Sequence, residues 1–133
     1  MKKIITSGKR KRAIAKALIR EGSGKVTINK KPFTSLQKFD KFKIEEPLRI
    51  AEKILGKLNF DIEINVKSGG EKSQIEAARV ALSRAIIKFT NSKELSEAFL
   101  SYDRNLLVAD VRRKEAYKPG DSRARAMRQT SYR

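Results

Sequence analysis

Cysteine and histidine are both absent from the 133-residue chain, and so is tryptophan. Without cysteine the protein has no disulfide, thiolate zinc site or cysteine nucleophile. Without histidine it lacks the usual general base and any Ser-His triad. These absences disfavour most hydrolytic and metalloenzyme chemistry. We therefore expect a protein that is not an enzyme, with no catalytic residues, bound metal, cofactor or small-molecule substrate.

Long uncharged runs are absent as well. The longest, residues 32–37, has six residues, whereas a membrane-spanning helix needs about 20 apolar residues. The charged start of the chain, residues 1–8, is not followed by the apolar region of a signal peptide. The sequence therefore predicts a soluble, cytoplasmic protein with no membrane partner.

Positive charge is what the chain has in excess. It contains 32 Lys and Arg against 15 Asp and Glu, which gives a formal net charge of +17. A polyanion relieves self-repulsion of this size, so nucleic acid is the expected partner. Much of the excess lies at the ends: residues 1–12 carry six basic and no acidic side chains, and residues 112–133 carry eight basic and two acidic ones.

The C-terminal basic segment also differs from the middle of the chain in apolar content. Residues 112–133 contain no Val, Ile, Leu or Phe. Such a segment cannot bury enough surface to offset its ordering entropy, so by itself it should be disordered. We therefore predict an RNA-binding domain over residues 1–111, with a basic N-terminal segment, followed by an extended basic tail over residues 112–133.

Hydrophobic patterning between the basic segments predicts an α+β domain, with a sheet that carries helices on one face. Residues 60–67 alternate apolar and polar side chains, the pattern of a half-buried strand. Residues 13–19 and 25–29 flank a glycine-containing turn and are predicted to pair as a hairpin. Glu45-Glu46-Pro47 makes a favourable helix start, with acids at the positive end of the helix dipole. The other predicted elements are helices over about residues 71–90 and 94–100 and a last strand over residues 106–108.

Four consecutive cations, Lys9-Arg10-Lys11-Arg12, precede the first predicted strand. They cannot all point the same way, so either some of them reach an anionic surface or the run is simply solvated. Phosphate binding is favoured because a second basic segment exists and because the excess charge lies outside the core.

Two other patterns have a structural interpretation that we prefer to the functional one. Ser68-Gly69-Gly70 before a helix could present backbone N–H groups to a phosphate. However, the lysine and glycine spacing of a P-loop is missing, and glycines are common in strand-to-helix turns for steric reasons. Four carboxylates have no catalytic partner at a recognisable spacing, so we expect solvated surface acids. These are Asp61, Glu63, Asp103 and Asp110.

The end of the chain is the most informative segment. From Arg123 to Arg133 it places arginines between small residues, with Tyr132 beside the last arginine. This pattern suits a chain that follows RNA phosphates and becomes ordered on contact, with the tyrosine available for stacking. A generic cationic tail is the alternative, but such a tail is more usually rich in lysine. Pro119-Gly120 would turn the segment away from the domain.

Motifs along essentially the whole chain occur in one recognisable order. They are Ser7–Ala15, Gly69-Gly70 with Gln74-Ile75, the alanine-rich Ala77–Arg84, Tyr102-Asp103-Arg104, Leu106–Asp110, Arg112-Arg113, Arg123-Ala124-Arg125, and Gln129 with Ser131-Tyr132-Arg133. Together they resemble the small-subunit ribosomal protein nine family, in its archaeal and eukaryotic branch. Ser68 departs from the pattern, since it stands where the family often has a third glycine.

The resemblance implies the fold of domain two of ribosomal protein S-five, with a left-handed βαβ crossover. It also implies a place in the head of the small ribosomal subunit, bound to its rRNA beside neighbouring ribosomal proteins. The tail would reach the peptidyl-tRNA site, with Arg133 near the anticodon stem-loop. The residues expected to bind rRNA are Lys9, Arg10, Lys11, Arg12, Arg112, Arg113, Lys114, Lys118, Arg123 and Arg125, and those expected to contact tRNA are Arg128, Tyr132 and Arg133.

Two alternatives belong to other functional classes. A free basic nucleic-acid-binding protein or RNA chaperone would share the charge but not the ordered motifs. A small RNA-processing enzyme would need carboxylates clustered for metal binding, and the sequence shows no such cluster.

Overall fold

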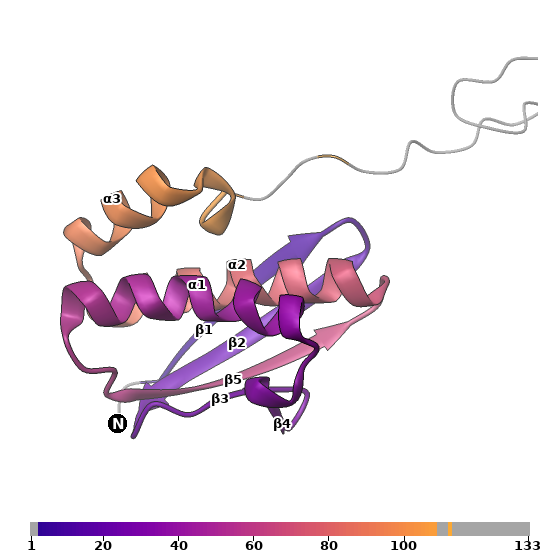
Figure 1. The fold of residues 1–133 in the computed structure, drawn as a ribbon, viewed down its shortest axis with the longest axis horizontal. Coiled ribbons are helices and arrows are strands. Elements are labelled where there is room, and N and C mark those ends of the chain that lie inside the picture. The colour runs from indigo at the N-terminus through magenta and orange to yellow at the C-terminus, as the bar shows by residue number, and fades with distance from the viewer. Residues whose placement is uncertain (1–2, 109–111, 113–133) are drawn as a thin grey trace, which may run out of the picture.

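Five strands form one mixed sheet in the order β1-β2-β5-β3-β4 in the computed structural model, which describes residues 3–108 and residue 112. The strands are β1 (Lys3–Arg10), β2 (Ala13–Glu21), β3 (Val26–Ile28), β4 (Lys31–Pro32) and β5 (Phe60–Lys67). The helices are α1 (Lys38–Leu55), α2 (Glu71–Thr90) and α3 (Lys93–Tyr102), with 3-10 turns at Phe33–Ser35 and Arg104–Leu106. All three helices lie on the same side of the sheet (Figure 1). The predicted α+β class, with helices on one face, is confirmed.

The hairpin predicted between residues 13–19 and 25–29 is wrong, because β5 lies between the two strands. β5 pairs antiparallel with β2 and parallel with β3. The partner of β2 on its other side is β1, an edge strand over residues 3–10 where the sequence predicts only a basic segment. Lys11-Arg12 forms the two-residue turn that joins these antiparallel strands.

Asp61 explains why the loop after β2 leads away from β2 instead of folding back onto it. Its Oδ1 accepts the backbone N–H groups of Ser23, Gly24 and Lys25 at 3.0, 3.1 and 3.0 Å. These hydrogen bonds hold the loop against the start of β5, so that β3 continues along the far side of β5. Asp61 is therefore a structural acceptor and not the merely solvated acid that the sequence suggests.

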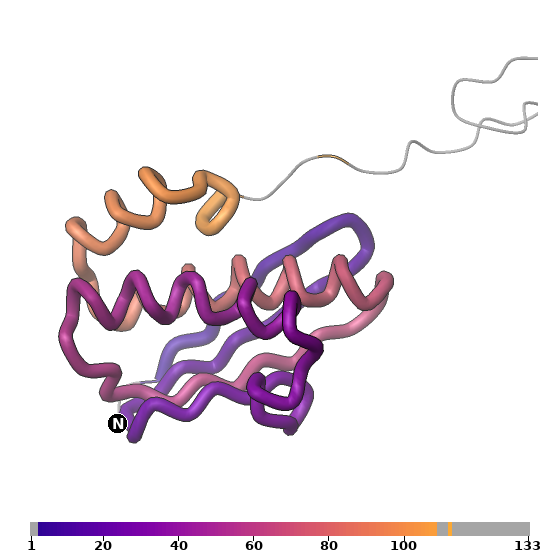
Figure 2. The backbone as a smooth tube through the Cα atoms, viewed as in Figure 1, coloured from indigo at the N-terminus to yellow at the C-terminus, as the bar shows by residue number. Residues whose placement is uncertain are grey.

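The path from β3 through α1 to β5 returns the chain to a parallel, neighbouring strand, which can be followed in Figure 2. α1 begins at Lys38, so the start predicted at Glu45-Glu46-Pro47 is wrong and Pro47 lies inside the helix. A proline there removes one backbone hydrogen bond. Burial offsets this local cost, since Ile44 is fully buried one turn earlier and Pro47 is itself buried.

The elements after α1 agree better with the predictions from the sequence. β5 and α2 have the predicted bounds, and α3 is slightly longer than the predicted helix over residues 94–100. The last strand predicted over residues 106–108 is wrong: Arg104–Leu106 is a 3-10 turn that buries Leu106. The Asp103 carboxylate favours this turn by accepting the backbone N–H of Asn105 at 3.0 Å.

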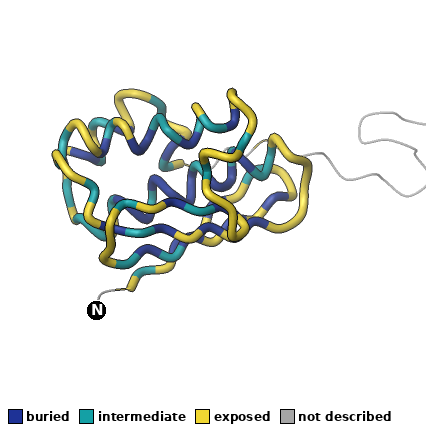
Figure 3. The backbone as a smooth tube through the Cα atoms, turned by 60° about the horizontal axis from the view of Figure 1, so that its bottom comes forward, coloured by how far each residue is buried: buried dark blue, intermediate teal, exposed yellow. Residues whose placement is uncertain are grey.

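Small residues allow α2 to pack closely against β1 and β2, and buried positions gather between the helices and the sheet (Figure 3). Gly8 lies where a Cβ atom would clash with the Ala77 carbonyl of α2. The neighbouring Thr6 hydroxyl donates a hydrogen bond of 2.8 Å to the Ala81 carbonyl. The edge strand β1 is thus fixed to α2 through backbone-level contacts, and this places the cationic hairpin turn beside the helices.

Candidate nucleic-acid interface

The β1–β2 hairpin carries all four cations of the predicted N-terminal cluster, but it sorts them onto different sides. Lys9 is exposed at the end of β1, and Lys11 and Arg12 are exposed in the turn. Lys11 has a φ of 53°, the left-handed conformation that a tight hairpin turn requires. Arg10 instead points toward the helices, where its side chain is only 14% exposed.

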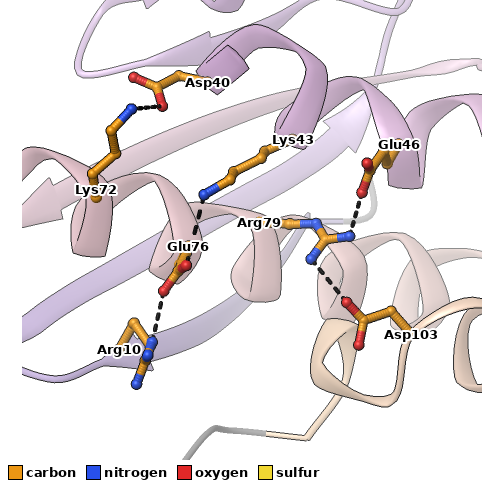
Figure 4. A network of polar contacts seen from close by, with 8 residues as sticks. All are labelled: Arg10, Asp40, Lys43, Glu46, Lys72, Glu76, Arg79 and Asp103. Carbon is orange, nitrogen blue, oxygen red and sulfur yellow. Dashed lines mark hydrogen bonds and ion pairs between the residues drawn. The ribbon is translucent and has the colours of Figure 1, made fainter.

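Arg10 already has a carboxylate partner within the domain. Its Nε lies 2.6 Å from Glu76 Oε2 on α2, and the same carboxylate lies 3.7 Å from Lys43 Nζ on α1 (Figure 4). An arginine that is largely buried and paired in this way joins β1 to the helices. Of the four cations in the cluster, Arg10 is therefore the least suited to bind an external phosphate.

Arg79 joins a second set of elements in the same network. Its guanidinium donates to Glu46 of α1 and, at 3.2 Å, to Asp103 Oδ2 just after α3 (Figure 4). Nearby, Lys72 Nζ lies 3.2 Å from Asp40 Oδ1, and that carboxylate is almost fully buried. These pairs join α1, α2 and the residue after α3, and they commit Lys72 and Arg79 to carboxylates within the domain.

A cavity of about 150 Å³ lies between β1, α1, α2, the turn after α3 and Arg112. The cavity brings together Lys9 and Arg10 from the N-terminal basic segment and Arg112 from the C-terminal one. Its five cations outnumber its two carboxylates, so the surroundings favour an anion. The cations are Lys9, Arg10, Lys43, Arg79 and Arg112, and the carboxylates are Glu76 and Asp103.

The remaining predicted site residues lie outside the residues that the structure describes. For rRNA binding these are Arg113, Lys114, Lys118, Arg123 and Arg125. For tRNA contact they are Arg128, Tyr132 and Arg133. The boundary predicted between residues 111 and 112 and the carboxylate of Asp110 also lie beyond the described ranges.

The steric interpretation of Ser68-Gly69-Gly70 holds for Gly69. Gly69 has a φ of 74°, and a Cβ atom there would lie 2.9 Å from the backbone nitrogen of Ala13. Gly70, the residue before α2, has no atom within 4 Å of its Cβ position and an extended backbone. The turn therefore needs one glycine for packing against the start of β2, and its second glycine has no such requirement.

Arg84 has a role that the sequence does not reveal. Its Nε donates to the Leu107 carbonyl at 3.0 Å, and its Nη1 donates to the Ser7 carbonyl at 2.9 Å. One guanidinium thus fixes the residues after α3 to the edge strand β1. No local pattern could have indicated this role, because its acceptors lie 23 and 77 residues away along the chain.

Residues 3–108 give little support to a catalytic carboxylate, a metal site or a membrane-spanning helix. The pKa of Asp61 is lowered by the hydrogen bond from the Lys25 backbone N–H, against the opposing effect of desolvation and with help from the N–H groups of Ser23 and Gly24. A carboxylate held in this way is structural. Within these residues no group of three His, Cys, Asp or Glu side chains could hold a metal ion, and no helix is long and apolar enough to cross a membrane.

A basic α+β domain with surplus cations at one hairpin belongs to the class of small proteins suited to bind nucleic acid. Comparison with known proteins narrows this class to one family. Residues 8–133 match the family described as Ribosomal protein S9/S16. The Small ribosomal subunit protein uS9 of Methanococcus vannielii is 53% identical over 136 residues, and that of Methanococcus maripaludis strain C7 is 52% identical, each over 100% of both chains.

The chain therefore belongs to the ribosomal protein S9/S16 family. This family is a structural, non-enzymatic class of ribosomal proteins. The fold agrees with the one that the resemblance implies, since α1 connects two parallel neighbouring strands of a mixed sheet.

Proposed function

We propose that the chain is a structural component of the small ribosomal subunit that binds the rRNA of the subunit head. The observation that carries this proposal is the group of exposed cations at the β1–β2 turn, Lys9, Lys11 and Arg12, with Arg112 on the cavity that Lys9 also lines. Cations that gather on one exposed part of the surface suit the phosphate backbone of RNA. The full-length similarity to small-subunit proteins supports small-subunit rRNA as the particular RNA.

The proposal extends to the C-terminal residues and to the other partners. Arg113, Lys114, Lys118, Arg123 and Arg125 would add rRNA contacts that begin beside the cavity at Arg112. The final residues Arg128, Tyr132 and Arg133 would reach the tRNA in the peptidyl site. Neighbouring small-subunit proteins would complete the environment, and the chain would occur in the cytoplasm as part of ribosomes. The family resemblance supports these contacts.

Sedimentation of cell lysate tests the ribosomal role. We expect the protein to migrate with small subunits in a sucrose gradient and to remain with them at a salt concentration that removes loosely bound basic proteins. A ribosomal protein stays because contacts that are not ionic, such as packing against the folded RNA and against neighbouring proteins, also hold it, whereas binding that depends on phosphate contacts alone weakens steeply with salt. Release of the protein to the top of the gradient at high salt would support the free nucleic-acid-binding alternative.

Deletion of Tyr132 and Arg133 tests the tRNA contact separately. The other basic residues remain, so we expect subunit assembly to be nearly normal. The peptidyl-site tRNA should dissociate faster, by an amount equivalent to about 1–3 kcal/mol, the range for a hydrogen bond to a charged group. The measurement is the off-rate of tRNA from subunits that carry the full-length or the truncated chain. Equal off-rates with normal assembly would show that these two residues contact rRNA only.

A further inference from the structure

One face of the sheet carries no helix, and its side chains differ sharply from those on the covered face. In β2 the residues that face the helices, at every second position from Ala13 to Ile19, are fully buried. The residues between them are exposed or half-buried. β5 shows the same alternation, with Lys67 among the exposed positions. The helix-free face of β1, β2 and β5, which we call the outer face, is therefore open within residues 3–108 (Figure 1).

The strand register gathers three lysines at one end of the outer face. Ile14 of β2 pairs with Lys9 of β1 on one side and with Lys67 of β5 on the other. Lys16 stands two residues further along β2. Adjacent strands are about 4.8 Å apart and alternate residues about 7 Å apart, so three cations surround Ile14 within a span of about 10 Å. Ile14 is 42% exposed between them.

Charge compensation distinguishes this end of the outer face from the opposite end. Within residues 3–108, none of Lys9, Lys16 and Lys67 forms an ion pair with a carboxylate. At the opposite end the Arg20 guanidinium lies 3.1 Å from Glu63 Oε1. The acids nearest to Lys67 along the chain are Glu63 and Glu71, each four residues away. Glu63 pairs with Arg20, and Glu71 lines a cavity on the helix side with Gln74 and Ile75.

We propose that the RNA-binding surface extends from Lys9 onto the outer face, where Lys9, Lys16 and Lys67 together form a site that contacts the sugar-phosphate backbone. This inference rests on the proposed rRNA binding and extends it to two lysines that the sequence does not single out. Three uncompensated ammonium groups favour a polyanion. The two exposed isoleucines of the outer face, Ile5 and Ile14, are separated by the paired row of Ser7, Lys16 and Asn65, so they do not form a continuous apolar patch that could dock a protein. Lysines that contact phosphates position an RNA without selecting its sequence.

The salt dependence of rRNA binding tests the site. The double variant K16A/K67A removes two of its lysines, and K53A/K88A is the matched control, because it removes the same charge from exposed positions on α1 and α2. With purified small-subunit rRNA as the probe, K16A/K67A should reduce the magnitude of the log–log slope of affinity against salt by about 1.4–1.8, since each contact contributes 0.7–0.9. The control should keep the slope of the unchanged chain.

Two further results complete the test. The charge-conserving variant K16R/K67R should restore most of the slope, and circular dichroism should show that all variants are folded. Equal slope changes in K16A/K67A and K53A/K88A would overturn the proposal, because they would report net charge alone. An unchanged slope in K16A/K67A would overturn it as well. If the unchanged chain itself fails to bind rRNA, then the proposed function fails, which is a different result.

Discussion

The turn between β5 and α2 contains two adjacent glycines whose substitution by alanine should have very different effects on stability. An alanine Cβ at position 69 would lie 2.9 Å from Ala13 N and 3.0 Å from Ala13 Cβ, at a φ of 74°. At position 70 the Cβ would meet no atom within 4 Å, at an extended φ of −85°. Gly69→Ala should therefore destabilise the domain strongly, whereas Gly70→Ala should change its stability little.

The size of the effect follows from two contributions. A left-handed backbone costs a residue with a Cβ about 1–2 kcal/mol. Forcing a Cβ against the backbone of Ala13 adds about 1–3 kcal/mol, the usual range for overpacking, so Gly69→Ala should cost about 2–5 kcal/mol in all. At Gly70 the reduced freedom of the unfolded chain opposes the loss of a favourable N-cap residue, which leaves a net change within about 0.5 kcal/mol.

Thermal unfolding followed by circular dichroism measures the difference. For a domain of this size each kcal/mol shifts the Tm by about 4–8 °C, so Gly69→Ala should lower the Tm by at least about 8 °C and Gly70→Ala by only a few degrees. Equal Tm values for the two variants would refute the reasoning, because they would show that the contact of Gly69 with Ala13 does not constrain the turn.

Two further predictions concern polar groups that the fold uses internally. The pKa of Asp61 is lower in the folded chain than its ordinary value of 3.8, so the stabilisation from Asp61 is complete above that value and is lost as the pH falls through the folded pKa. Asp61→Asn should therefore lower the free energy of unfolding at neutral pH and flatten its acid dependence in pH-dependent denaturation; an unchanged acid limb would contradict this. Arg84→Gln removes the hydrogen bonds to Leu107 and Ser7, so amide exchange over residues 103–108 should accelerate more than exchange in β5, and uniform acceleration would instead indicate global destabilisation.

Local patterns predict those elements whose stability is decided locally or by their own periodicity. β5 alternates without interruption, and α2 has a long apolar stripe, so both have the predicted bounds. The elements that differ depend on distant partners. β2 and β3 are separated because the Asp61 carboxylate, about 37 residues away, holds the connecting loop. α1 extends past Pro47 toward its N-terminus because burial against α2 outweighs a local helix signal.

The candidate site, like the fold, could be predicted from the sequence only in part. Composition indicates the kind of partner, because net charge does not depend on the fold. Composition cannot distinguish a cation that is available to a partner from one that pairs with an acceptor inside the domain. Arg79 and Arg84 are committed to internal acceptors, whereas Lys16 and Lys67 become candidates only when the strand register places them on one face. Arginine suits the internal contacts because its planar guanidinium is weakly hydrated and so loses little hydration energy on partial burial. The ammonium of lysine is strongly hydrated and remains at the surface.

Lys9 and Arg10 put this distinction to a direct test, because they are adjacent cations on opposite sides of β1. Arg10 pairs with Glu76 at 2.6 Å and is mostly buried, so Arg10→Ala should cost about 1–2 kcal/mol of folding free energy, a hydrogen bond to a charged group reduced because Glu76 is partly exposed. Lys9 is exposed and belongs to the outer-face site, so Lys9→Ala should leave the Tm unchanged and reduce the salt slope of rRNA binding by about 0.7–0.9. Both variants lose one positive charge, so each is the control for the other in paired unfolding and binding measurements. If both variants lowered the Tm equally, or if both reduced the slope equally without loss of stability, the division of the cluster between folding and RNA binding would be wrong.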